Sequence, residues 1–211
     1  MEVLERALAN VSVAASQPSG TLKLSMSPSF GADYIVPLLP EFMARFPAVV
    51  PRLFVANSEA VQNRVAERSL DLGFIEGDSH LALLATDVCC EDELQVTCAP
   101  SHPLAKLKAA TPETLTHYAD ISREPGSGTR EVIDHYLQEA GVAPDGLQRV
   151  MELGSPEALK GLVATGLGFA IMSRATVVNE IRLGQLVQVP LAPPLLRRLV
   201  LAGHLGRKTG R

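Results

Sequence analysis

Residues 123–130, Arg-Glu-Pro-Gly-Ser-Gly-Thr-Arg, have the composition of a loop that binds a small anion. The apolar residues after this loop recur with helical spacing, so we expect it to open a helix. Its glycines permit backbone conformations that a β-carbon resists, and its hydroxyls can cap the helix start, where several N–H groups point outward. Those N–H groups and the two arginines would hold an anion. The alternative is a capped helix start with solvated arginines. The candidate contacts are Arg123, Ser127, Gly128, Thr129 and Arg130.

Other expected helix starts also carry hydroxyl side chains. If the two halves of the chain face each other, these starts would converge on a cleft and bind a metabolite with modest affinity. The alternative is that serine is simply a common capping residue. These further starts contain Ser27, Ser29, Ser58 and Ser155.

The first half of the chain alternates between strand and helix patterns. This order is typical of parallel strands with right-handed crossovers, in which ligands lie at the carboxyl ends of the strands. We expect strands at 21–27, 50–56 and 70–76, a turn at 28–33, a helix over Ile35–Phe46, and a helix capped by Ser58 that runs to about Arg68.

The second half continues the alternation after a proline-rich connection at Pro100 and Pro103, where a lobe boundary is expected. The expected elements are two strands within 81–99 around the acidic turn 91–93, a short helix near 112–118, strands at 119–123, 147–153 and 168–172, helices after Thr129 and Ser155 and over 175–182, and closing strands at 185–191 and 198–202.

At the beginning of the chain we expect a helix over residues 1–16, which we interpret as the end of a linker helix.

Composition argues against several classes of protein. A net charge of -4, no tryptophan and 4% aromatic residues do not suit a nucleic-acid surface, and the adjacent Arg197 and Arg198 are expected at a solvated strand end. No apolar run is long enough to span a membrane, and the first residues are not expected to act as a secretory signal. Three cysteines suit a reducing cytoplasm better than a disulfide framework. A zinc site built from Cys89, Cys90, Cys98 and His102 is disfavoured, so no metal or cofactor is expected.

The chain also lacks the motifs of common enzymes. A nucleophile elbow requires Gly-x-Ser-x-Gly, and Gly126-Ser127-Gly128 does not have that spacing. No phosphate-binding Gly-x-x-x-x-Gly-Lys-Ser/Thr loop occurs. The five histidines are scattered without an evident partner, so we do not expect catalysis.

Several segments, taken in order, resemble the effector-binding region of LysR-type transcriptional regulators, from about Gly20 to His204. The order and spacing of these segments carry the resemblance. They are GTLKLSMSPSFGADYIVPLLPEFMARFP (20–47), VANS ending at Ser58, RVAERSLDLGFIEG (64–77), APSHPLA (99–105), REPGSGTR (123–130) and ELGSPEALKGLVATGLGFAIMS (152–173).

The resemblance implies an α/β fold of two Rossmann-like lobes joined by two crossover strands, similar to periplasmic binding proteins. Lobe I would comprise 20–98 and 174–211, lobe II 99–173, and residues 1–17 the end of a linker helix. DNA would be bound only through a winged helix-turn-helix domain outside this chain, and the sensor would be cytoplasmic, without a membrane partner. A free solute-binding protein of the same fold is the alternative function.

The resemblance also implies an effector site in the cleft between the lobes and a homodimer or homotetramer. Sulfate, sulfite or a small organic acid are the implied effectors, although a carboxylate at Glu76 would repel a dianion unless a positive charge compensates it. The effector contacts would be Ser27, Ser29, Asn57, Ser58, Glu76, Arg123, Ser127, Gly128, Thr129 and Met172. The dimer contacts would be Ile35, Leu39, Phe42 and Phe46, whose alternative role is internal core.

Overall fold

The computed structural model describes residues 18–143 and 145–205. The helix expected over residues 1–16 lies outside this described part. Within it, no helix is both long enough and apolar enough to cross a membrane.

The chain forms two compact units. Unit 1 takes in the described residues up to Cys90 and those from Arg198 onward, and unit 2 is Glu91–Arg197. Strands β4 (Leu84–Cys98) and β9 (Leu195–His204) run through both units. The sequence assigned 91–98 and 174–197 to the first lobe, whereas the structure groups them with unit 2. Hydrogen bonding explains this grouping, because residues 94–98 of β4 pair with β7 (Phe169–Ser173) and residues 96–98 with β8 (Val187–Val189).

The sheet of unit 1 has the strand order β2-β1-β3-β9. Strands β1 (Gly20–Met26), β2 (Val49–Val55) and β3 (Leu72–Glu76) are parallel, and β9 runs antiparallel to β3. The chain between β1 and β2 is helical from Pro28, as α2 (Pro28–Phe30), a π-helical turn (Gly31–Ile35), a 3-10 turn (Val36–Leu38) and α3 (Leu39–Arg45). The turn expected at 28–33 is therefore wrong, since Pro28 takes a first-turn position where its missing N–H costs little.

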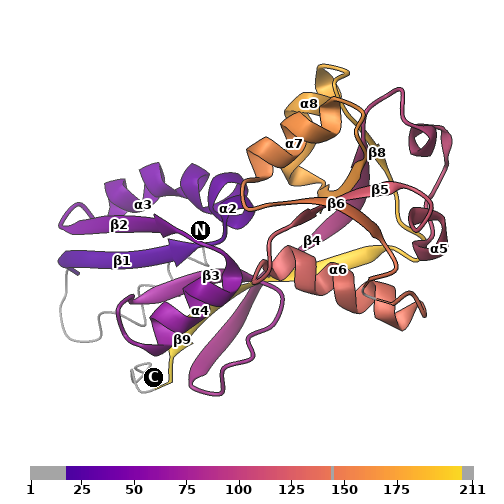
Figure 1. The fold of residues 1–211 in the computed structure, drawn as a ribbon. Coiled ribbons are helices and arrows are strands. Elements are labelled where there is room, and N and C mark those ends of the chain that lie inside the picture. The colour runs from indigo at the N-terminus through magenta and orange to yellow at the C-terminus, as the bar shows by residue number, and fades with distance from the viewer. Residues whose placement is uncertain (1–17, 144, 206–211) are drawn as a thin grey trace. The chain divides into compact units, whose positions relative to one another are not determined.

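Two apolar layers cover the sheet of unit 1 because alternate strand residues face opposite sides. Phe74 packs with Phe30, Ile35 and Phe42 on the side of α2 and α3, whereas its neighbour Ile75 packs with residues of α4 (Ser58–Ala66). Helices α3 and α4 accordingly lie on opposite faces of these strands (Figure 1).

Unit 2 repeats this plan with the strand order β8-β4-β7-β5-β6. Strand β5 (Ala119–Arg123) is parallel to β6 (Gln148–Leu153) and β7, and β4 is antiparallel to β7. The helices are α5 (Pro112–Leu115), α6 (Gly128–Glu139), α7 (Pro156–Ala164) and α8 (Val178–Arg182), with 3-10 turns at Pro103–Lys106 and Ala175–Val177. The α/β fold of two Rossmann-like lobes that the resemblance implies is confirmed.

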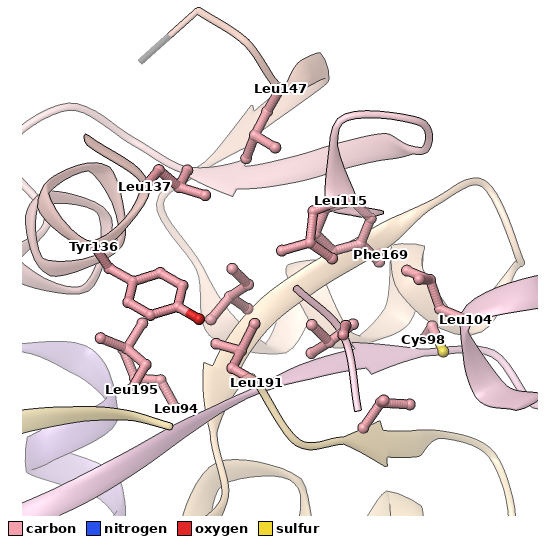
Figure 2. Packing of buried hydrophobic residues seen from close by; sticks show 14 of the residues in the cluster. Leu94, Cys98, Leu104, Leu115, Tyr136, Leu137, Leu147, Phe169, Leu191 and Leu195 are labelled. Carbon is pink, nitrogen blue, oxygen red and sulfur yellow. The ribbon is translucent and has the colours of Figure 1, made fainter. Parts of the chain in front are cut away.

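Unit 2 likewise has a core on each side of its sheet. Phe169 and Ile171 face a cluster that includes Tyr136 and Leu137 of α6, which Figure 2 shows around Leu94 and Leu191. The hydroxyl of Tyr136 donates to the carbonyl of Pro193 at 2.8 Å, so the ring is buried without an unsatisfied polar atom. The alternate β7 residues face a second cluster under α7.

One strand replaces the two that the sequence predicted within 81–99. β4 continues through the acidic residues 91–93, which were expected to turn. Asp92 is only 5% exposed and pairs with Arg197 of β9, so its charge is compensated within the fold and the strand does not need to leave the sheet.

Candidate functional site

The glycine bend and the helix start that the sequence predicted at residues 123–130 are present at the beginning of α6. Gly126 has a φ of 81°, a conformation that favours glycine, and it places Ser127 at the helix start. The N–H of Glu131 donates to the carbonyl of Ser127 at 3.1 Å as the first bond of the helical ladder. The amides of residues 128–130 precede that bond and have no acceptor inside the helix.

Ser127 differs from the residues that cap neighbouring helices. Its side chain makes no capping bond, and its buried hydroxyl oxygen has no hydrogen-bond partner among residues 18–143 and 145–205. By contrast, Asn57 Oδ1 accepts from Ala60 N at 3.0 Å at the start of α4, and Ser155 Oγ accepts from Ala158 N at 3.3 Å at the start of α7. A buried hydroxyl without a partner is unfavourable. Ser127 therefore has a hydroxyl without a partner among the described residues, directly before the amides that have no acceptor inside the helix.

Arg123, one of the two arginines expected to flank an anion, is already engaged. Its Nε donates to Glu124 Oε2 at 2.9 Å and its Nη2 to Glu124 Oε1 at 3.2 Å. The guanidinium is buried, so this bidentate pair neutralises it in place. As placed here, Arg123 brings no uncompensated charge to the loop.

Arg130 belongs to a network that joins α6 to β6. Its Nη1 donates to the carbonyl of Arg123 at 3.2 Å and pairs with Glu152, and its Nε lies 3.5 Å from Asp134 Oδ2. Arg149 of β6 pairs with the same Asp134. Arg130 therefore holds the loop against its neighbours instead of pointing free charge toward a ligand.

Arg197 is the arginine that touches the start of α6, and the sequence analysis missed it. Its Nη1 donates to Thr129 Oγ1 at 2.7 Å. The expectation that Arg197 and Arg198 lie at a solvated strand end is wrong for Arg197, which is 2% exposed, and right for the exposed Arg198. Neighbouring residues of a strand face opposite sides of the sheet, and this alternation is the only sequence feature that could have predicted one buried and one exposed arginine.

Unit 1 brings three of its predicted site residues together. Ser27 Oγ donates to Glu76 Oε1 at 3.0 Å, and the N–H of Glu76 donates to Ser58 Oγ at 3.1 Å. All three side chains are buried. Ser58 is the first residue of α4 and not its cap, which is Asn57. The assignment of these residues, and of the buried Ser29, to effector binding stays a prediction.

Other predicted contacts lie in apolar cores. Met172 is 4% exposed and packs with Leu159 and Val163 under α7. Of the predicted dimer residues, Ile35 and Phe42 are buried in the core of unit 1, while Leu39 and Phe46 are half-buried against it. The exposed apolar side chains of the same helical region are instead those of Val36 and Met43, 50% and 52% exposed.

The cysteines and His102 have separate surroundings. Burial raises the pKa of Cys98, on β4, to about 11. His102 Nδ1 accepts from the N–H of Leu104 at 3.2 Å, and burial lowers the pKa of His102. Among residues 18–143 and 145–205, no three His, Cys, Asp or Glu side chains are placed to hold a metal ion.

Comparison with known proteins agrees with this architecture. Two α/β units linked by strands that run through both define a periplasmic-binding-protein-like fold of two lobes. The model of the LysR substrate binding domain matches residues 15–210. The chain belongs to this family.

Two of the curated relatives are transcriptional regulators that are longer than this chain. The chain is 34% identical over 193 residues to the uncharacterized HTH-type transcriptional regulator YeiE of Escherichia coli, which covers 91% of the chain and 64% of the relative. It is 31% identical over 162 residues to the HTH-type transcriptional regulator CysL of Bacillus subtilis, which covers 77% and 53%. The chain thus spans less than two thirds of either relative.

Solved structures show the same fold. The regulatory domain of Synechocystis PCC6803 CcmR, solved in complex with 2-PG, has 28% identity and a TM-score of 0.81, with 90% of each chain covered. The effector-binding domain of QuiR, solved in complex with shikimate, has a TM-score of 0.80 at 19% identity, again with 90% of each chain covered.

Proposed function

We propose that this chain is the effector-sensing part of a LysR-type transcriptional regulator and that it binds a small anion at the start of α6. The family membership and the regulators among its relatives support the first part. The sensor would act in the cytoplasm, with DNA bound by a different part of the protein. The cleft between the lobes that the resemblance implies stays a prediction.

The buried, unpartnered hydroxyl of Ser127 carries the second part of the proposal. It lies at the start of a twelve-residue helix whose first amides have no helical acceptor. The positive end of the helix dipole attracts an anion to these amides, and the hydroxyl can donate to the same anion. An anion there would accept from the hydroxyl and from the amides of the first turn together.

A small oxyanion is the ligand class that suits these donors. Sulfate, sulfite and small organic acids are the candidates, and 2-PG is added because it was solved with the CcmR domain. A thermal-shift screen of these compounds identifies the effector, since a ligand that binds only the folded chain raises the melting temperature.

Isothermal titration calorimetry with two serine variants tests the site. Ser127→Ala removes a hydroxyl that makes no bond within the protein, so it should weaken binding of the strongest anion in the screen at least tenfold. Ser155→Ala is the matched control, because it changes a helix-start serine with a capping bond in the same unit and should leave affinity unchanged. Equal affinities for all three proteins would overturn the proposal.

We also propose that the chain self-associates through the helical region from Pro28 to Phe46. The support is the pair of exposed apolar side chains on it, Val36 and Met43, next to the half-buried Leu39. Sedimentation should show that Met43→Glu lowers the association constant, while Leu183→Glu, a change at an exposed leucine in unit 2, leaves it unchanged. Sedimentation of the unaltered chain as a monomer would contradict this.

A further inference from the structure

A buried ion pair adjoins the anion site at α6. Arg197 Nε donates to Asp92 Oδ2 at 2.7 Å, and Nη2 lies 2.6 Å from the same oxygen. The third nitrogen, Nη1, donates to Thr129 Oγ1 in the first turn of the helix. The two charged side chains are only 1% and 3% exposed, so water screens them weakly.

Asp92 is fixed from a second direction. Ser173 Oγ donates to Asp92 Oδ1 at 2.8 Å, and this hydroxyl in turn accepts from the N–H of Ala175 at 3.1 Å. The carboxylate therefore has hydrogen-bond donors on both oxygens. These hydrogen bonds hold the Asp92 carboxylate in place, so its negative charge is linked to Thr129 through the guanidinium of Arg197 alone.

This geometry has a consequence for the charge of the ligand. The guanidinium attracts an anion at the start of α6, whereas the carboxylate behind it repels the same anion. Both electrostatic energies are proportional to the charge of the ligand. Because the attraction and the repulsion nearly cancel, a second negative charge on the ligand gains little further binding free energy from the ion pair. A site with an unpaired arginine would instead favour dianions strongly.

We propose that Asp92 sets the charge preference of the α6 site, with Arg197 as the positioning residue that links Asp92 to Thr129. The inference rests on the proposed function and states which ligand charges the site accepts. The site accepts a singly charged oxyanion, such as a sulfonate or a monocarboxylate, nearly as well as a dianion of the same shape.

The test uses sulfate and methanesulfonate, which are both tetrahedral but carry two charges and one. Calorimetric titrations at constant ionic strength should give wild-type affinities within about threefold of each other. A preference for sulfate of tenfold or more would overturn the inference, and this comparison needs no variant to fold.

Asp92→Asn then removes the opposing charge while keeping an oxygen that can accept from Arg197. We expect sulfate to bind about tenfold more tightly and methanesulfonate about threefold, because the dianion gains twice as much free energy. Equal gains, or no gain, would contradict a charge effect. Asp92→Asn combined with Arg197→Gln restores a neutral pair and should restore the wild-type ratio of affinities.

Glu180→Gln is the matched control. It also removes one carboxylate of unit 2, but Glu180 pairs with Lys160 at 2.8 Å, between α7 and α8 and not at the start of α6. The Glu180→Gln protein should have the same ratio of sulfate to methanesulfonate affinity as the wild type. If no anion of the screen binds the wild type, the proposed function and this inference fail together. Binding of another anion of the screen but of neither sulfate nor methanesulfonate, or unchanged selectivity in Asp92→Asn, overturns the inference alone.

Discussion

The polar clusters at the helix starts of the two units are completed in different ways. In unit 1, Ser27, Glu76 and Ser58 bond to one another, so the protein itself supplies an anionic group beside the starts of α2 and α4. In unit 2, the Ser127 hydroxyl has no hydrogen-bond partner in the part of the chain that the structure describes. A helix start that is complete within the fold contributes to stability, and one that is incomplete is available to a ligand.

The largest expected loss of stability follows from breaking the buried ion pair of unit 2. Arg197→Ala leaves Asp92 buried without its ionic partner and should lower the free energy of unfolding by about 3–5 kcal/mol. Its neighbour Arg198 pairs with Asp78 on the surface, so Arg198→Ala should cost about 1 kcal/mol or less. Urea denaturation of both variants measures the difference, and equal losses would show that the buried pair does not stabilise unit 2.

The next effect compares the two clusters directly. Ser27→Ala removes a hydrogen bond to a buried carboxylate and should lower the free energy of unfolding by about 1.5–3 kcal/mol. Ser127→Ala removes no bond and should change it by less than about 0.5 kcal/mol. Both values come from denaturant unfolding without added anions. A large loss in Ser127→Ala would mean that this hydroxyl is already used within the fold.

A smaller effect is expected at the start of α7. Ser155→Ala removes the capping bond to Ala158 and should cost about 1 kcal/mol. Comparing this loss with that of Ser127→Ala distinguishes a serine that stabilises a helix from one that does not. Thermal unfolding by circular dichroism is sufficient, and identical melting temperatures for Ser155→Ala and the wild type would contradict the assignment of the cap.

The smallest effect concerns pH. Burial lowers the pKa of His102 from its ordinary value of 6.5, because the charged form of the ring is shielded from water. The unfolded chain then binds more protons, so the free energy of unfolding should decrease as the pH falls below 6.5. In His102→Gln this part of the decrease should be absent. Unfolding measured at about pH 7.5 and pH 5.5 checks it, and an equal decrease in both proteins would contradict it.

Local patterns predicted most of the fold because each strand and helix has its own periodicity. The glycine bend before α6 and the cap at Ser155 were predicted for the same reason, since glycine, serine and proline act within a few residues. The single strand β4 was not predicted, because an acidic triplet is typical of a turn until a distant arginine compensates it.

The charge at the site could not be predicted because it depends on contacts distant in sequence. Arg123 and Arg130 flank the loop, and only the fold shows that carboxylates engage both. Arg197 lies 68 residues from Thr129, and no local pattern pairs them. The burial of Met172 in the core under α7 could not be predicted either, because it also depends on contacts distant in sequence.

Amide chemical shifts test the central claim most directly. In a two-dimensional nitrogen–proton NMR spectrum, sulfate added to the labelled chain should move the signals of Gly128, Thr129 and Arg130 most, and Ser127→Ala should reduce those shifts. An anion that leaves these three amides unmoved, or that moves the start of α7 equally, would contradict binding at α6.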